Sequence, residues 1–132
     1  MIKSKLTFIN ILIVVSVLVI IFHLLIFVRV VPYEITWGGR LKSIEEMYVF
    51  ETFSILINSF FIFILLQKAE YIHSFMGKKI VTLILWIFFT IFVLNTIGNL
   101  FAETNFEKFF TILTLTNAIL IWKINKKLPN SA

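Results

Sequence analysis

The chain has no cysteine and few charged residues. The absence of Cys from all 132 residues excludes disulfide exchange, dithiol–quinone chemistry, thiolate metal sites and palmitoylation. Only 14% of the residues are charged, whereas soluble domains have about a quarter. At the same time 60% are hydrophobic, which is more apolar surface than a soluble protein of this length can bury. The composition therefore indicates a membrane protein.

Apolar stretches fill most of the chain, and each of the four is long enough to cross a bilayer. About 20 mostly apolar residues in a helix span roughly 30 Å of hydrocarbon. The stretches run over residues 6–31, 47–66, 80–101 and 105–122. The first is too long for the apolar core of a signal peptide and no small-residue cleavage site follows it, so we expect an anchor. We predict one integral membrane domain over residues 1–132, an all-α antiparallel four-transmembrane-helix bundle.

Basic residues predict the orientation, because Lys and Arg are retained on the cytoplasmic side. The two termini and the loop between the second and third stretches hold one acid, Glu70, and these lysines: Lys3, Lys5, Lys68, Lys78, Lys79, Lys123, Lys126 and Lys127. The opposite side holds the other acids with fewer basic residues. We therefore expect both termini in the cytoplasm, with the protein in the inner (plasma) membrane. The net charge of +5 then serves as anchoring charge, and no nucleic-acid partner is expected.

Several short motifs predict where helices begin and end. Ser43 fits an N-cap, with Glu46 reaching back to the backbone N–H of Ser43 in a capping box. Residues 104–107 repeat this pattern before the fourth stretch. Pro32 is expected to end the first helix, and Gly38-Gly39 to let the first loop turn back.

Polar residues inside the spans are the functional candidates. Glu51 lies about 10 Å along its helix from Ile44, and a carboxylate at such depth costs a few kcal/mol unless it is paired, hydrated or protonated. His23 lies about 26 Å and Asn95 about 23 Å from the cytoplasmic ends of their helices. These similar depths predict an outward-facing polar pocket beneath the first external loop, residues 32–40.

We expect this pocket to bind a ligand without catalysing a reaction. The candidate ligand-binding residues are Glu51, Asn95, Asn99, His23, Arg40, Trp37 and Asn58. No catalytic residue is assigned. No metal or cofactor is expected, because His23 and His73 fall on opposite sides of the bilayer.

A structural alternative applies to the same residues. Amides and hydroxyls in membrane helices often hydrogen-bond a neighbouring helix at about 0.6 kcal/mol each. Glu51 can likewise form a purely structural salt bridge. Its partner stays open among Arg29, Arg40, His23 and the amides of the third stretch, because the sequence does not fix helix rotation.

Two segments carry a resemblance to a known family. The first reads VPYEITWGGRL over residues 31–41 and continues with Glu46-Met47 and Phe50-Glu51, and the second reads LNTIGNL over residues 94–100. Together they resemble a family of small, uncharacterised four-helix bacterial membrane proteins, over most of the chain. That family has no assigned activity, so the resemblance implies a bacterial inner-membrane protein and no particular reaction.

Four functions are compatible with these residues. The favoured hypothesis is a pocket for a small molecule or lipid headgroup, with Glu51 as its charged anchor. The second is a proton-coupled small exporter working as a dimer and resembling small multidrug transporters, although their essential carboxylate lies on the first helix. The others are a lipid- or isoprenoid-modifying enzyme with Glu51 and His23 as acid and base, and an accessory subunit of a larger membrane complex. Expected partners are membrane lipids, a small-molecule ligand, and a second copy or a larger complex.

Overall fold

Four long helices make up most of the part of the chain that the structure describes. The computed structural model describes residues 3–35, 41–101 and 105–126. The helices are α1 (Lys3–Phe27), α2 (Ile44–Lys68), α3 (Lys78–Leu100) and α4 (Asn105–Asn125), and a short 3-10 turn, η1, covers Tyr33–Ile35. The expected all-helical architecture is confirmed.

Three of these helices, α1, α2 and α3, are long and apolar enough to cross a membrane. Helix α4 has 21 residues, which is sufficient length, but its sequence is interrupted by threonines, asparagines and charged residues. Three of the four expected spans therefore have the length and composition of membrane helices. The structure thus supports a helical membrane protein.

The helix ends follow local side-chain and backbone chemistry. Ser43 caps α2, since its hydroxyl accepts a hydrogen bond from the backbone N–H of Glu46 at 3.1 Å. The Glu46 carboxylate accepts a hydrogen bond from the backbone N–H of Lys42 at 2.9 Å. The capping box predicted the N–H of Ser43, the next residue, as this donor. The capping box before α4 and the Gly38-Gly39 turn involve residues outside the described ranges.

Helix α1 ends at Phe27, five residues before Pro32. The prediction that Pro32 ends the first helix is therefore wrong. Arg29 adopts the left-handed conformation with a φ of 65°. This conformation turns the chain back, so that the N–H groups of Val30 and Val31 both reach the carbonyl of Leu25, at 2.9 and 3.2 Å. Such a turn satisfies carbonyls that the last helical turn leaves open.

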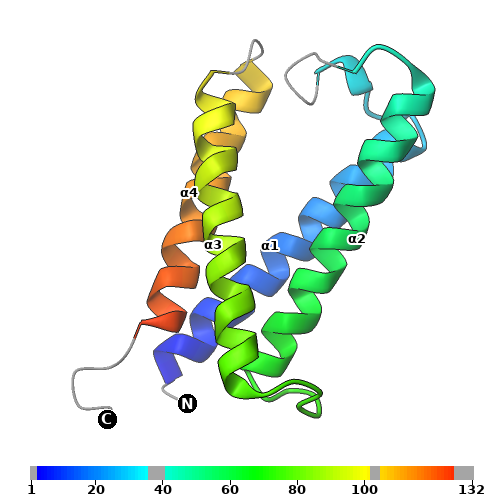
Figure 1. Ribbon diagram of the computed structural model, residues 1–132. Coiled ribbons are helices and arrows are strands. Elements are labelled where there is room, and N and C mark those ends of the chain that lie inside the picture. Colours follow the sequence, from blue (N-terminus) through cyan, green and yellow to red (C-terminus); the bar gives the residue numbers. More distant parts are fainter. Residues whose placement is uncertain (1–2, 36–40, 102–104, 127–132) are drawn as a thin grey trace.

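The helices form two hairpins that meet at one end and spread apart at the other (Figure 1). Helix α1 packs mainly on α2, and α3 packs mainly on α4. The start of α1, the α2–α3 connection and the end of α4 lie together at the end where the hairpins meet. We call this the basic end, because its described charged residues are Lys3, Lys5, Lys68, Glu70, Lys78, Lys79, Lys123 and Lys126. The opposite end is called the open end.

The largest apolar cluster lies toward the basic end and joins all four helices. Its fully buried members include Leu12 of α1, Phe61 of α2, Leu85 of α3 and Ile121 of α4. The ring centroid of Phe61 lies 4.6 Å from that of Phe88 in α3. The two hairpins are therefore held together mainly in this half of the molecule.

Candidate functional site

A buried acid–imidazole pair joins α1 to α2 near the open end. The Nδ1 atom of His23 lies 2.5 Å from Oε2 of Glu51. Glu51 is fully buried and the side chain of His23 is 16% exposed. The structure thus brings together two candidates whose similar depths were deduced from residue counting. We call them the His23–Glu51 pair.

The helix faces explain how this pair forms. Met47, Glu51 and Ser54 are all buried and follow one another at spacings of four and three along α2. Residues with these spacings share one helix face, and α1 is the main helix packed against α2. Glu51 therefore lies on the buried face of α2, where a partner from another helix is needed.

A proton must lie between the two atoms of the pair, since two acceptors would repel each other at that separation. The contact supplies a hydrogen bond to a carboxyl group that has lost its contact with water. Hydrogen bonds with an ionised partner are about twice as strong as neutral ones. The pair places an imidazole and a carboxyl group in contact between α1 and α2.

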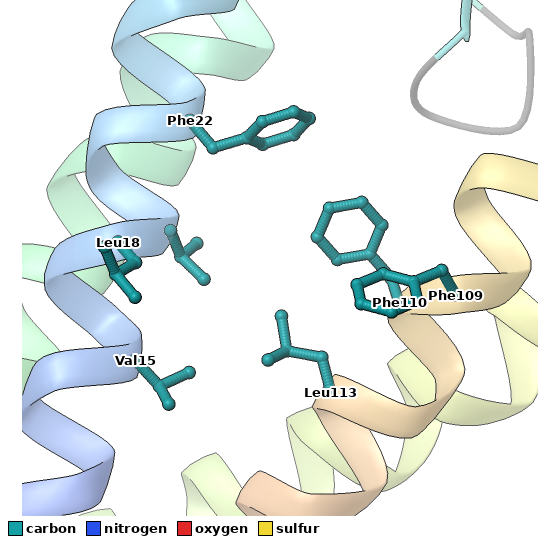
Figure 2. A pocket seen from close by; sticks show the side chains of 7 residues that line it. Val15, Leu18, Phe22, Phe109, Phe110 and Leu113 are labelled. Carbon is teal, nitrogen blue, oxygen red and sulfur yellow. The ribbon is translucent and has the colours of Figure 1, made fainter.

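An apolar cleft lies between α1 and α4, where the two hairpins spread apart. Its volume is about 280 Å³. The lining consists of hydrocarbon and aromatic side chains: Val15, Leu18, Val19, Phe22, Phe109, Phe110 and Leu113. Figure 2 shows Phe22 extending from α1 toward Phe110 of α4, with their ring centroids 5.4 Å apart. The cleft thus has the character of a site for hydrocarbon.

Phe22 connects the cleft to the His23–Glu51 pair. Its ring lines the cleft and also meets the ring of His23 edge-on, with centroids 5.8 Å apart. An aromatic side chain therefore separates the apolar cleft from a buried titratable pair. His23 does not line the cleft itself, because as the next residue of α1 its side chain points about 100° away around the helix, toward Glu51.

The cleft has a weak signal in the sequence. Val15, Leu18, Val19 and Phe22 have the spacing of one helix face. However, α1 is largely apolar on all sides, so no hydrophobic period distinguishes this face from the exposed face or from the face that contacts α2. The Phe109-Phe110 pair at the start of α4 is the clearest indication, and only the packing shows which side it faces.

The other candidates lie apart from the pair. Asn58 is half-buried and donates from Nδ2 to the backbone carbonyl of Ser54 at 2.8 Å, within its own helix. On α3, Asn95 is exposed and Asn99 is half-buried. Arg40 and Trp37 lie outside the described residues.

Another residue of α3, Thr96, makes a buried polar contact with α4. Thr96 is 8% exposed, and its hydroxyl lies 2.8 Å from that of Thr114 in α4. Because Thr96 follows Asn95 directly, its side chain points about 100° away around the helix. Asn95, which was expected to face the pocket, therefore lies beside a residue that contacts α4 and is itself exposed.

Metal-binding side chains do not gather within residues 3–35, 41–101 and 105–126. No group of three or more His, Cys, Asp or Glu side chains there could hold a metal ion. His73 lies on the α2–α3 connection, where its ring meets that of Phe75 at 5.4 Å between centroids. It is remote in the fold from His23 near the open end.

No family model, curated protein or solved structure matches the chain, so the resemblance carried by residues 31–51 and 94–100 gains no support from these comparisons.

Proposed function

We propose that this chain is a small integral membrane protein that binds an amphiphilic molecule at its open end. The four helices cross the inner membrane as an antiparallel bundle with both termini in the cytoplasm, and the open end faces outward. The apolar part of the ligand lies in the cleft between α1 and α4. Its polar group lies at the Phe22 end of the cleft, beside the His23–Glu51 pair.

The observation that carries this proposal is the apolar cleft adjoining a buried polar pair. Phe22 contributes to both, since its ring lines the cleft and touches His23. The orientation is supported by the lysines of the basic end, which the positive-inside rule assigns to the cytoplasm. Phe22 then lies about 28 Å along α1 from Lys3, which is in the outer half of the bilayer.

An apolar cleft alone gives little selectivity inside a membrane. Lipid tails are as apolar as the side chains of Leu, so transfer of a hydrocarbon chain into the cleft has almost no hydrophobic driving force. Affinity must come from shape and from polar contacts. The imidazole of His23 touches the Phe22 ring of the cleft lining and contacts the buried carboxyl of Glu51, so the proposed polar contact favours a ligand with a hydrogen-bonding or charged headgroup.

The test is ligand-dependent thermal stability of the purified full chain in detergent. The probes are oleate, geranylgeraniol, phosphatidylethanolamine and a quaternary ammonium detergent, compared over a range of concentrations. Leu113→Trp fills the cleft from α4, whereas Ile112→Trp adds the same bulk at a neighbouring side chain that is 66% exposed. Glu51→Gln removes the acid.

We expect at least one probe to raise the melting temperature of the wild type and of Ile112→Trp but not of Leu113→Trp. Glu51→Gln is expected to lose the preference for particular headgroups. If Leu113→Trp responds to every probe as the wild type does, the cleft is not the binding site. If no probe stabilises the wild type, the proposed function is wrong.

A second candidate is a proton-coupled small exporter working as a dimer. It is favoured by the burial of Glu51 against His23, because acid and histidine side chains inside membranes form the proton relays of pumps and transporters. In proteoliposomes with an imposed pH gradient, an exporter would accumulate a cationic probe, and Glu51→Gln would abolish this uptake. A binding protein would show no gradient-driven uptake in either form.

A further inference from the structure

We propose that Asn95 and Asn99 of α3 form a hydrogen-bonding subsite that selects a ligand with an uncharged hydroxyl headgroup, such as a monoacylglycerol. We call these two residues the amide face. The inference rests on the proposed function, because it concerns the polar group of the same amphiphile. It names the chemical class of that group and adds a contact from α3.

The amide face continues the row of α3 that packs against α2. Phe88 and Phe92 form the packed part of this row, with ring centroids 4.6 and 5.4 Å from that of Phe61 in α2. Asn95 follows Phe88 by seven residues, which is close to two helical turns. Asn99 follows Phe92 by the same number. Each amide therefore points in nearly the same direction around α3 as the phenylalanine before it, toward the side of α2.

The spread of the hairpins leaves the amide face open. Phe88 is 5% exposed, whereas Asn95 is exposed and Asn99 is half-buried, although all three lie on one row. This row is packed where the hairpins meet and uncovered where they spread apart (Figure 1). Neither amide makes a hydrogen bond within residues 3–35, 41–101 and 105–126. Because an amide without a hydrogen-bond partner is unfavourable in hydrocarbon, a ligand that supplies one is favoured here.

The amide face lies level with the Phe22 end of the cleft. The hydroxyls of Thr96 in α3 and Thr114 in α4 lie 2.8 Å apart, which aligns the two helices of this hairpin. Asn99 lies about 4.5 Å beyond Thr96 along α3. Because the chain reverses between these helices, Phe110 lies about 6 Å from Thr114 in the same direction. The ring of Phe110 contacts that of Phe22. A ligand whose chain fills the cleft would thus carry its headgroup to the height of Asn99.

The chemistry of the amide face favours an uncharged hydroxyl group. Each amide has two N–H donors and a carbonyl acceptor, so it can bond a hydroxyl group as donor or as acceptor. Between Ile80 and Leu100, α3 has no charged residue. A hydroxyl group completes these hydrogen bonds without bringing a charge into the membrane, where charges are costly. A quaternary ammonium group has no N–H to donate, and a carboxylate brings a negative charge.

The experiment compares monoolein with methyl oleate, which has the same acyl chain but no hydroxyl group. Thermal stability of the purified full chain in detergent is measured over a range of concentrations of each probe. The readout is the concentration that gives half of the maximal shift in melting temperature. Asn95→Leu and Asn99→Leu remove the amides, and Asn99→Gln keeps one.

Thr90→Val is the matched control on the same helix. Thr90 is exposed, and its hydroxyl donates to the backbone carbonyl of Trp86 within α3. It precedes Asn99 by nine residues, which places it half a turn away around the helix. The control therefore removes a polar group of α3 without touching the amide face.

We expect monoolein to bind the wild type more tightly than methyl oleate does. Asn95→Leu and Asn99→Leu should each weaken monoolein binding about fivefold, the value of one neutral hydrogen bond, and leave methyl oleate binding unchanged. Thr90→Val should bind both probes as the wild type does. Asn99→Gln should bind monoolein more tightly than Asn99→Leu.

Three results would overturn the proposal. Equal binding of the two probes by the wild type would show that the hydroxyl groups are not recognised. Unchanged monoolein binding in both leucine variants would show that the amides lie outside the site; if Leu113→Trp still abolishes the shift, the proposed function stands and only the subsite is wrong. If oleate stabilises the wild type and monoolein does not, the cleft binds a ligand but the class of headgroup is wrong.

Discussion

Replacement of His23 by Leu is expected to destabilise the protein more than replacement of Glu51 by Gln. Loss of the imidazole removes the hydrogen bond to Oε2 of a carboxyl group that is fully buried. Removal of one partner from a buried pair costs about 3–5 kcal/mol. Glu51→Gln keeps the shape of the side chain and leaves a neutral amide that can still meet His23, so its cost is about 1.5–3 kcal/mol, the value of a charge-assisted hydrogen bond.

The double variant tests whether these costs share one origin. With both changes, a buried neutral amide faces a leucine, and no buried acid loses a partner. The double variant should therefore be less destabilised than the sum of the single variants by at least about 1 kcal/mol, within the range found for residues in direct contact.

The assay is equilibrium unfolding in mixed micelles of dodecyl maltoside and SDS, followed by circular dichroism. Glu46→Gln is the matched control on the same helix, since Glu46 is exposed and bonds the backbone of Lys42; its cost should not exceed about 1 kcal/mol. Additive costs for His23 and Glu51, or a larger cost for Glu51→Gln than for His23→Leu, would refute the reasoning.

Two further predictions use the same unfolding assay. Thr96→Val and Thr114→Val should each cost about 0.6 kcal/mol of unfolding free energy. The double variant should cost little more than either alone, because each change removes the same 2.8 Å contact between the two hydroxyls. Fully additive costs would contradict a shared hydrogen bond. Phe61→Ala should cost about 3–5 kcal/mol, because Phe61 is fully buried against Phe88 at the meeting point of the hairpins. Phe53→Ala, at a side chain that is 61% exposed, is its control and should stay within about 0.5 kcal/mol of the wild type.

Sequence reasoning found the helices because membrane spans need long apolar runs. It also found the cap of α2, because an N-cap serine needs only local chemistry. The common depth of His23 and Glu51 followed from a rise of about 1.5 Å per residue. That counting gives height along a helix and says nothing about direction around it.

The rotation of α3 about its own axis explains why its polar candidates do not join the His23–Glu51 pair. Asn95 and Thr96 are neighbours in sequence, yet Thr96 is buried against α4 while Asn95 is exposed. In a soluble protein the apolar period would have fixed the rotation of α3. The exposed and buried faces of α3 are both largely apolar, so the amphipathic signal is weak and only packing decides which face turns inward.

The two hairpins spread apart at the open end because most of the contacts between them lie toward the basic end. Toward the basic end, Leu12, Phe61, Leu85 and Ile121 are fully buried in one cluster. At the open end, the His23–Glu51 pair joins α1 to α2 within one hairpin. This pair makes no link between the two hairpins. The Phe22–Phe110 ring contact bridges α1 and α4 there. Such a contact is worth about 0.5–1.5 kcal/mol. A ligand of the proposed kind entering the cleft at this end would therefore displace only a weak interaction, while the cluster at the other end would keep the hairpins joined.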